Sequence, residues 1–138
     1  MGRKSARKCA FQIVFQMPFY ADFDCKEVLR VFFESPEFSK DADDDDREYI
    51  EKDVHGVCER LFEIDELISA YTVGWDIERI SKVDLAIIRL AVYEMKYNED
   101  IPPGVAINEA VELAKEFGDD DSPGFVNGIL GTMFRMMG

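Results

Sequence analysis

The C-terminal part of the sequence carries two helical patterns on either side of an acidic turn. In residues 105–117, apolar side chains recur at the spacing of one helical face, and Gly118 is predicted to end this helix in the left-handed conformation. For a second helix, the pattern predicts Ser122 as the N-cap and Pro123 at the first helical position. Its apolar stripe consists of Val126, Ile129, Leu130, Met133 and Met137. Two successive helices, each with one apolar face, favour a packed all-α architecture.

Helical periodicity accounts for most of the remaining chain, and no segment has the pattern of a strand. Helices are predicted over 5–19, 26–33, 47–71 and 83–95, the last one apolar nearly all round and therefore expected at the centre of a bundle. Ser81 is its predicted N-cap. Residues 34–46 are predicted to form a loop, because Ser, Pro and acidic residues leave little to bury. We expect one all-α domain spanning residues 1–138.

Charge is distributed unevenly along the chain. The net charge of −13 argues against a surface that binds nucleic acid everywhere, yet the first ten residues carry four basic side chains and no acidic one. This asymmetry predicts one small basic patch that meets a polyanion.

The first predicted helix places its basic side chains on the same side as two aromatic ones. Arg3, Lys4, Arg7 and Lys8 spread around one direction, and Phe11 and Phe15 continue that row, whereas the apolar set points about 120° away. Cations that contact phosphates and rings that stack on unpaired bases suit single-stranded RNA. The alternative is a basic N-terminus that merely aids solubility, with both rings covered by a neighbouring helix. The residues alone leave these two interpretations open.

Phe125 lies about 95° from the centre of the second C-terminal stripe and close to Asp119, Asp120 and Asp121. A large aromatic residue off the core face and beside an acidic turn is a candidate docking residue. The alternative is that Phe125 is an ordinary core residue.

The sequence gives little support for catalysis, a cofactor or a metal site. His55 is the only histidine, no glycine-rich phosphate-binding pattern occurs, and the acidic run 41–46 lacks the glycine of a calcium loop. Three widely spaced cysteines are typical of reduced thiols. No signal peptide and no apolar run of 18 residues are present, so we expect a cytoplasmic protein without a membrane partner.

Four ordered motifs resemble the NusB family of transcription antitermination factors. Residues 107–118 read INEAVELAKEFG, and S-x-x-FVNGIL follows at 122–130. Residues 84–94, DLAIIRLAVYE, are similar to the central-helix motif of the family. Ile101-Pro102 fits the usual lead-in, and Ala6-Arg7 with Ala10 and Gln12 fits the first helix. The resemblance covers nearly the whole chain in the right order.

The resemblance implies a bundle of about seven helices in two sub-bundles, and a non-enzymatic factor that binds boxA-type single-stranded RNA in ribosomal RNA leader transcripts. Its protein partner would be NusE, a small-subunit ribosomal protein, and both would join the RNA polymerase elongation complex. The implied RNA-binding residues are Arg3, Lys4, Arg7, Lys8 and Phe15, and the implied partner-binding residues are Asp121, Ser122 and Phe125.

The chain departs from the family pattern at Ser5, which interrupts the basic residues, and two of the four are lysines. Lysine lacks the bidentate phosphate contact of arginine. Two alternatives stay open: a detached RNA-targeting module of an rRNA methyltransferase system, and a structural homodimer with the basic helix buried against its mate.

Overall fold

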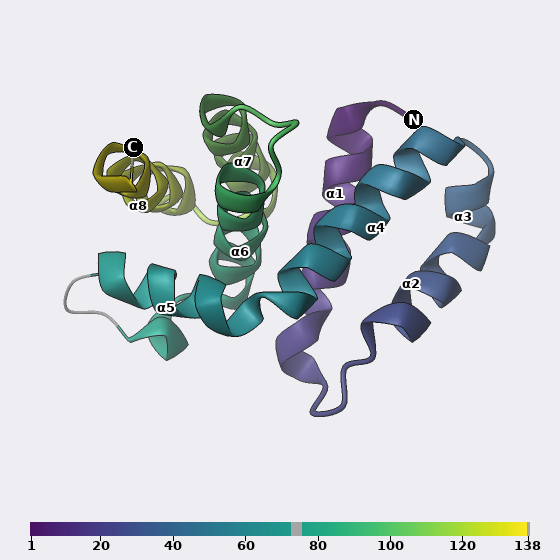
Figure 1. Ribbon diagram of the computed structural model, residues 1–138, viewed down its shortest axis with the longest axis horizontal. Coiled ribbons are helices and arrows are strands. Elements are labelled where there is room, and N and C mark those ends of the chain that lie inside the picture. The colour runs from purple at the N-terminus through teal and green to yellow at the C-terminus, as the bar shows by residue number, and fades with distance from the viewer. Residues whose placement is uncertain (73–75, 138) are drawn as a thin grey trace.

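A computed structural model describes residues 1–72 and 76–137, which form eight α-helices and two short 3₁₀ helices (Figure 1). The all-α class is confirmed, and the helix count is close to the predicted seven because α3 is a single turn. The α-helices are α1 (Arg3–Gln16), α2 (Cys25–Glu34), α3 (Pro36–Ser39), α4 (Asp44–Glu59), α5 (Leu61–Tyr71), α6 (Lys82–Tyr97), α7 (Pro103–Phe117) and α8 (Ser122–Met137). The 3₁₀ helices are η1 (Met17–Phe19) and η2 (Ile77–Arg79).

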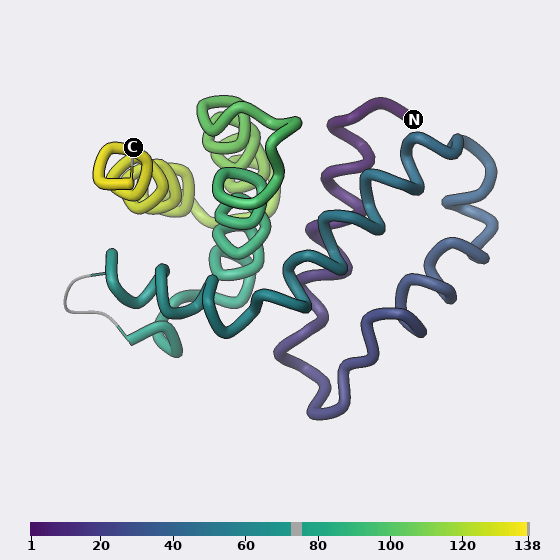
Figure 2. Tube along the Cα trace, in the orientation of Figure 1, coloured from purple at the N-terminus to yellow at the C-terminus, as the bar shows by residue number. Residues whose placement is uncertain are grey.

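The helices form two groups, as the tube along the chain makes clear (Figure 2). Helices α1 to α4 make up one sub-bundle, in which α4 crosses α1, and α5 to α8 make up the other. Helix α6 joins the two, because it contacts α1 and α4 on one side and α5, α7 and α8 on the other. Within the described residues, no helix is both long enough and apolar enough to cross a membrane.

Helix α6 is the centre of the bundle, as predicted. Every residue from Asp84 to Glu94 is buried. The helix begins after Ser81, whose hydroxyl oxygen accepts a hydrogen bond from the Asp84 N–H at 3.1 Å, so the predicted N-cap is confirmed. Gly56 lets α4 pack closely against α6, since a Cβ atom there would lie 2.1 Å from the Tyr93 ring.

The prediction of one continuous helix over 47–71 is wrong. The chain leaves the helical conformation at Arg60, with φ −113° and ψ 19°, and α5 starts in a new direction. The Arg60 guanidinium lies 4.2 Å from the centroid of the Tyr97 ring on α6. This contact comes from a residue far along the chain, and no proline or glycine marks the break.

The prediction of a loop over 34–46 is also wrong in part. Ser35 caps the single turn of α3, and its hydroxyl oxygen accepts from the Phe38 N–H at 3.4 Å. Asp43 and Asp46 form a reciprocal capping box at the start of α4, with N–H to carboxylate distances of 2.8 and 3.1 Å. Acidic side chains at this end accept hydrogen bonds from free N–H groups and complement the helix dipole, so part of the acidic run starts a helix.

Candidate functional site

The basic residues of α1 lie in two different environments. Arg3, Lys4 and Lys8 keep 48%, 72% and 41% of their side chains exposed, whereas the Arg7 side chain is only 5% exposed. The Arg3 guanidinium also lies over the Tyr49 ring of α4, 4.2 Å from its centroid. Three of the four predicted RNA-binding cations are therefore accessible.

Arg7 does not project away from the core as its place in the basic row suggested. Its Nε atom lies 3.1 and 3.3 Å from the two carboxylate oxygens of Glu94 on α6, and Nη1 lies 3.8 Å from Glu109 on α7. Burial lowers the pKa of Arg7, but the charge and hydrogen bond of Glu94, together with Tyr49 and Glu109, outweigh it, so the pKa is raised and the guanidinium stays charged. Arg7 joins three helices in the interior, and the carboxylates of Glu94 and Glu109 already hold its guanidinium.

A buried polar network surrounds this ion pair. The Tyr49 hydroxyl donates to Glu94, and the Asn98 amide donates to Asp53 at 3.2 Å. The second oxygen of Asp53 receives no hydrogen bond from any described residue, and the Glu94 carboxylate lies beside it. Burial and this neighbouring carboxylate raise the pKa of Asp53 to about 9, so Asp53 is protonated at neutral pH and can donate to Glu94. The network fixes α1 relative to α4 and α6.

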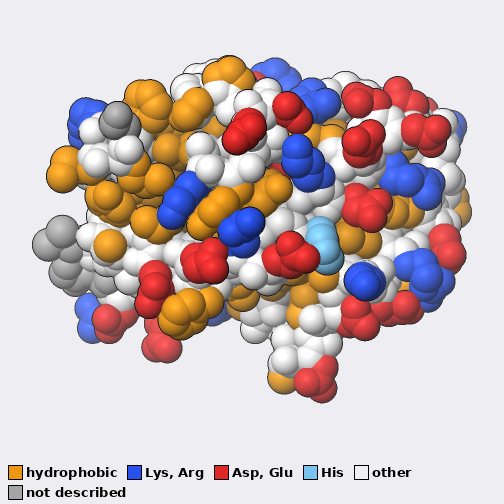
Figure 3. Space-filling model, in the orientation of Figure 1, with side chains coloured by type: hydrophobic (Ala, Val, Ile, Leu, Met, Phe, Trp, Pro, Cys, Tyr) orange, Lys and Arg blue, Asp and Glu red, His pale blue; other side chains and the backbone are white. Residues whose placement is uncertain are grey.

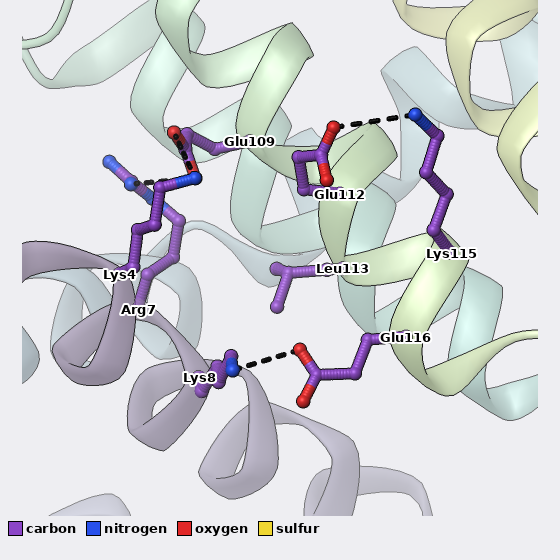
Figure 4. A pocket seen from close by; sticks show the side chains of 8 residues that line it. All are labelled: Lys4, Arg7, Lys8, Glu109, Glu112, Leu113, Lys115 and Glu116. Carbon is purple, nitrogen blue, oxygen red and sulfur yellow. Dashed lines mark hydrogen bonds and ion pairs between the residues drawn. The ribbon is translucent and has the colours of Figure 1, made fainter.

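A hollow of about 360 Å³ lies between α1 and α7, and Figure 4 shows its side chains. We call it the α1–α7 hollow. Its three exposed lysines each face a glutamate: Lys4 Nζ lies 3.6 Å from Glu109, Lys8 Nζ lies 2.9 Å from Glu116, and Lys115 Nζ lies 3.4 Å from Glu112. The remaining lining residues are Arg7 and Leu113. Lysine nitrogens that hold carboxylate oxygens here could hold phosphate oxygens in the same way.

The aromatic row of α1 is partly covered. Phe11 is 3% exposed and its ring centroid lies 5.0 Å from that of Phe117 on α7, so for Phe11 the alternative of a covered core ring is correct. Phe15 is half-buried. Phe19 is 56% exposed, and its ring meets the edge of the Phe15 ring at 5.2 Å. The sequence interpretation missed Phe19 and the equally exposed Tyr20, although the four-residue spacing from Phe15 to Phe19 was visible across Pro18.

The acidic turn after α7 has a different geometry from the predicted one. Gly118 has φ −92°, so the left-handed prediction is wrong. Glycine is needed there for space, because a Cβ atom would lie 2.4 Å from the Ser122 side chain. Ser122 is the first residue of α8. Its hydroxyl oxygen accepts a hydrogen bond from the Asp119 N–H at 3.0 Å. The Asp119 carboxylate accepts hydrogen bonds from the N–H groups of Asp121 and Ser122 and orders the turn before α8, which begins at Ser122 itself.

Phe125 lies at the start of α8, half-buried against the core. Its ring lines a hollow of about 340 Å³ between the starts of α6 and α8, which we call the acidic hollow. Asp121 is exposed at the same hollow, whereas Ser122 is buried and supports the turn from within. The other lining residues are Arg79, Ile80, Ser81, Asp84 and Asp119. An aromatic surface bordered by carboxylates could receive a basic partner with an apolar anchor.

Histidine is absent from the described lining of both hollows. Among the described residues, no three His, Cys, Asp or Glu side chains lie close enough together to hold a metal ion. His55 is partly exposed on α4, away from both hollows, and its Nε2 lies 2.9 Å from Glu59. Its side chain is the pale blue one at the surface in Figure 3, where acidic and basic side chains surround it. A hydrogen bond with Cys25 raises the pKa of His55.

Comparison with known proteins gives consistent matches. A model described as the NusB family matches residues 4–135. The transcription antitermination protein NusB of Acetivibrio thermocellus is 43% identical over 99% of this chain and 90% of its own length. NusB of Bacillus subtilis is 44% identical over 96% of this chain and 95% of its own length.

Solved structures agree with the sequence comparisons. T. maritima NusB superposes with a TM-score of 0.88 at 36% identity, covering 98% of this chain and 92% of that one. A crystal structure of the antitermination factors NusB and NusE in complex with dsRNA superposes with a TM-score of 0.84 at 26% identity, covering 97% and 96% of the two chains.

Proposed function

Because the chain belongs to the NusB family, we propose that it is a cytoplasmic, non-catalytic transcription antitermination factor. In this proposal it binds boxA-type single-stranded RNA in ribosomal RNA leader transcripts together with NusE, the small-subunit ribosomal protein. The pair then acts on the RNA polymerase elongation complex. The solved complex of a similar NusB with NusE and dsRNA supports binding of both kinds of partner.

The RNA proposal rests on one observation, the row of side chains along α1. Lys4 and Lys8 are exposed cations, and Phe15 follows on the same side with Phe19 against its edge. Cations along a helix can contact the phosphates of an RNA strand, and accessible rings beyond them can stack on its bases. We assign phosphate contacts to Arg3, Lys4 and Lys8 and stacking to Phe15. Arg7 supports them from the interior.

The partner proposal rests on the acidic hollow. Phe125 offers an aromatic surface and Asp121 an exposed negative charge, while Ser122 holds the turn through its hydrogen bonds with Asp119. NusE would have to present basic side chains around an apolar group to fit this hollow. The two hollows have no lining residue in common, so RNA and protein would bind at different places.

A titration tests the proposal directly. Fluorescence anisotropy of a labelled boxA-type RNA, with and without NusE, gives the affinity of the protein and of the complex. We expect Lys4→Glu and Lys8→Glu each to weaken RNA binding, whereas the matched control Lys26→Glu, an exposed lysine on α2, leaves it unchanged. Equal RNA affinity in the wild type and in the three variants would refute the assignment of the RNA-binding face to α1.

Sedimentation separates this function from the structural homodimer. We expect sedimentation to show a heavier species when RNA or NusE is added, because each forms a complex with the protein. A stable dimer that takes up neither would favour the homodimer with its basic helix covered. RNA binding without any binding to NusE would favour a targeting module of an rRNA methyltransferase system.

A further inference from the structure

Carboxylates offset most of the positive charge in the α1–α7 hollow. Its lining residues include four cations and three carboxylates, so most of the positive charge that α1 contributes is neutralised by α7 (Figure 4). The glutamates Glu109, Glu112 and Glu116 repeat at intervals of three and four residues and therefore share one face of α7.

We propose that Glu112 and Glu116 limit the affinity of this chain for RNA of any sequence, by occupying lysines of the hollow and by repelling the phosphates that approach them. This proposal rests on the proposed function, because it assigns a regulatory role to carboxylates at the same RNA-binding site. It makes tight binding depend on base stacking and on the protein partner.

Burial distinguishes the three glutamates. The side chain of Glu109 is only 17% exposed and lies within ion-pair distance of both Lys4 and Arg7, so it belongs to the supporting structure. Glu112 and Glu116 are both 47% exposed. They can move away from their lysines without disturbing the core, and they remain at the rim of the hollow when they do.

Glu116 has the most direct effect, because its carboxylate lies 2.9 Å from Lys8 Nζ and bridges α7 to α1. Exposed ion pairs of this kind are weak, so a phosphate can displace the carboxylate. The displaced carboxylate stays at the rim of the hollow, where its negative charge repels the phosphate. The same reasoning applies to Glu112, which pairs with Lys115 on its own helix.

The experiment compares Glu116→Gln, Glu112→Gln and the control Glu66→Gln, which removes the same charge from an exposed position on α5. The probes are a 12-nucleotide boxA-type RNA and a 12-nucleotide RNA of unrelated sequence, titrated at several KCl concentrations. At low salt we expect Glu116→Gln to raise affinity about threefold to tenfold, with a smaller increase for Glu112→Gln. The slope of log affinity against log salt should steepen by about 0.7 for each further phosphate that the protein neutralises on a single strand.

The increase should be the same for both RNAs, because phosphates carry no sequence information. Unchanged affinity in Glu116→Gln would overturn the inference, and so would an equal increase in Glu66→Gln or an increase confined to the boxA-type RNA. If one of these results occurs while Lys8→Glu still weakens RNA binding, the inference about the glutamates fails but the proposed RNA face stands. If Lys4→Glu and Lys8→Glu change nothing, the proposed RNA-binding face on α1 itself fails.

Discussion

The guanidinium of Arg7 lies against the carboxylate of Glu94, with 3.1 Å between Nε and Oε1, and both side chains are almost fully buried. The two residues are 87 positions apart in the sequence, and their ion pair holds α1 against α6. The same helix carries the exposed Lys4 and Lys8.

We expect Arg7→Ala to lower the free energy of unfolding by about 3–5 kcal/mol, because it leaves the Glu94 charge buried without its partner. Urea unfolding followed by circular dichroism measures the loss. Lys4→Ala serves as the control, since its side chain is 72% exposed and its removal should change stability by less than about 0.5 kcal/mol. Equal stability of the two variants would show that Arg7 is not an interior support.

The contribution of Asp53 to stability should fall as the pH rises from about 4 to about 9. Burial raises the pKa of Asp53 from 3.8 to about 9, so between these values the folded protein holds a proton that the unfolded chain has lost. Since the folded state binds more protons, the free energy of unfolding decreases with pH across this window and levels off above about pH 9. Asp53→Asn keeps the shape of the protonated carboxyl and should flatten the decrease between pH 6 and 8.5. The exposed Asp22→Asn should retain the wild-type slope, and a wild-type slope in Asp53→Asn would contradict the assignment.

Phe125→Ala should weaken the complex with NusE by about 2 kcal/mol or more, as expected for an aromatic anchor. Because the ring is half-buried, we also expect a stability loss of about 1–2 kcal/mol, less than for a full core residue. Phe62→Ala, which removes a 75% exposed ring from α5, is the matched control for both measurements. A large drop in melting temperature with NusE affinity preserved would make Phe125 a core residue only.

Asp121→Lys should also weaken binding to NusE, because it replaces an attractive charge at the rim with a repulsive one toward a basic partner. Isothermal titration at two salt concentrations tests this, since the effect should shrink as salt rises. RNA binding by the chain alone should stay unchanged. A loss of RNA affinity in this variant would show that the acidic hollow also contributes to the RNA site.

Cys25 should be the most reactive of the three thiols. A hydrogen bond from Cys58, together with the nearby His55, lowers the pKa of Cys25 to about 6, whereas burial raises the pKa of Cys9. Alkylation by iodoacetamide, followed by peptide mass spectrometry, should show a midpoint for Cys25 near pH 6. Cys58→Ala should move that midpoint upward, and a wild-type midpoint above 8 would contradict this account.

The sequence predicted the features that depend on neighbours along the chain. The Ser81 cap and the buried α6 followed from local spacing, and so did the apolar face of α1. The burial of Arg7 and the break at Arg60 could not be predicted in this way, because Glu94 and Tyr97 meet them only after the chain has folded. For the same reason, spacing placed the lysines of α1 on one side but could not show that glutamates of α7 face them.

The α1–α7 hollow draws its two walls from different sub-bundles, α1 from the first and α7 from the second. The hollow is therefore created by the docking of two halves, although the residues proposed to contact RNA all lie on α1 in the first half. Any event that slides one half against the other would change the distance between the lysines and their glutamates. The affinity of this molecule for a polyanion therefore depends on how closely its two halves pack together.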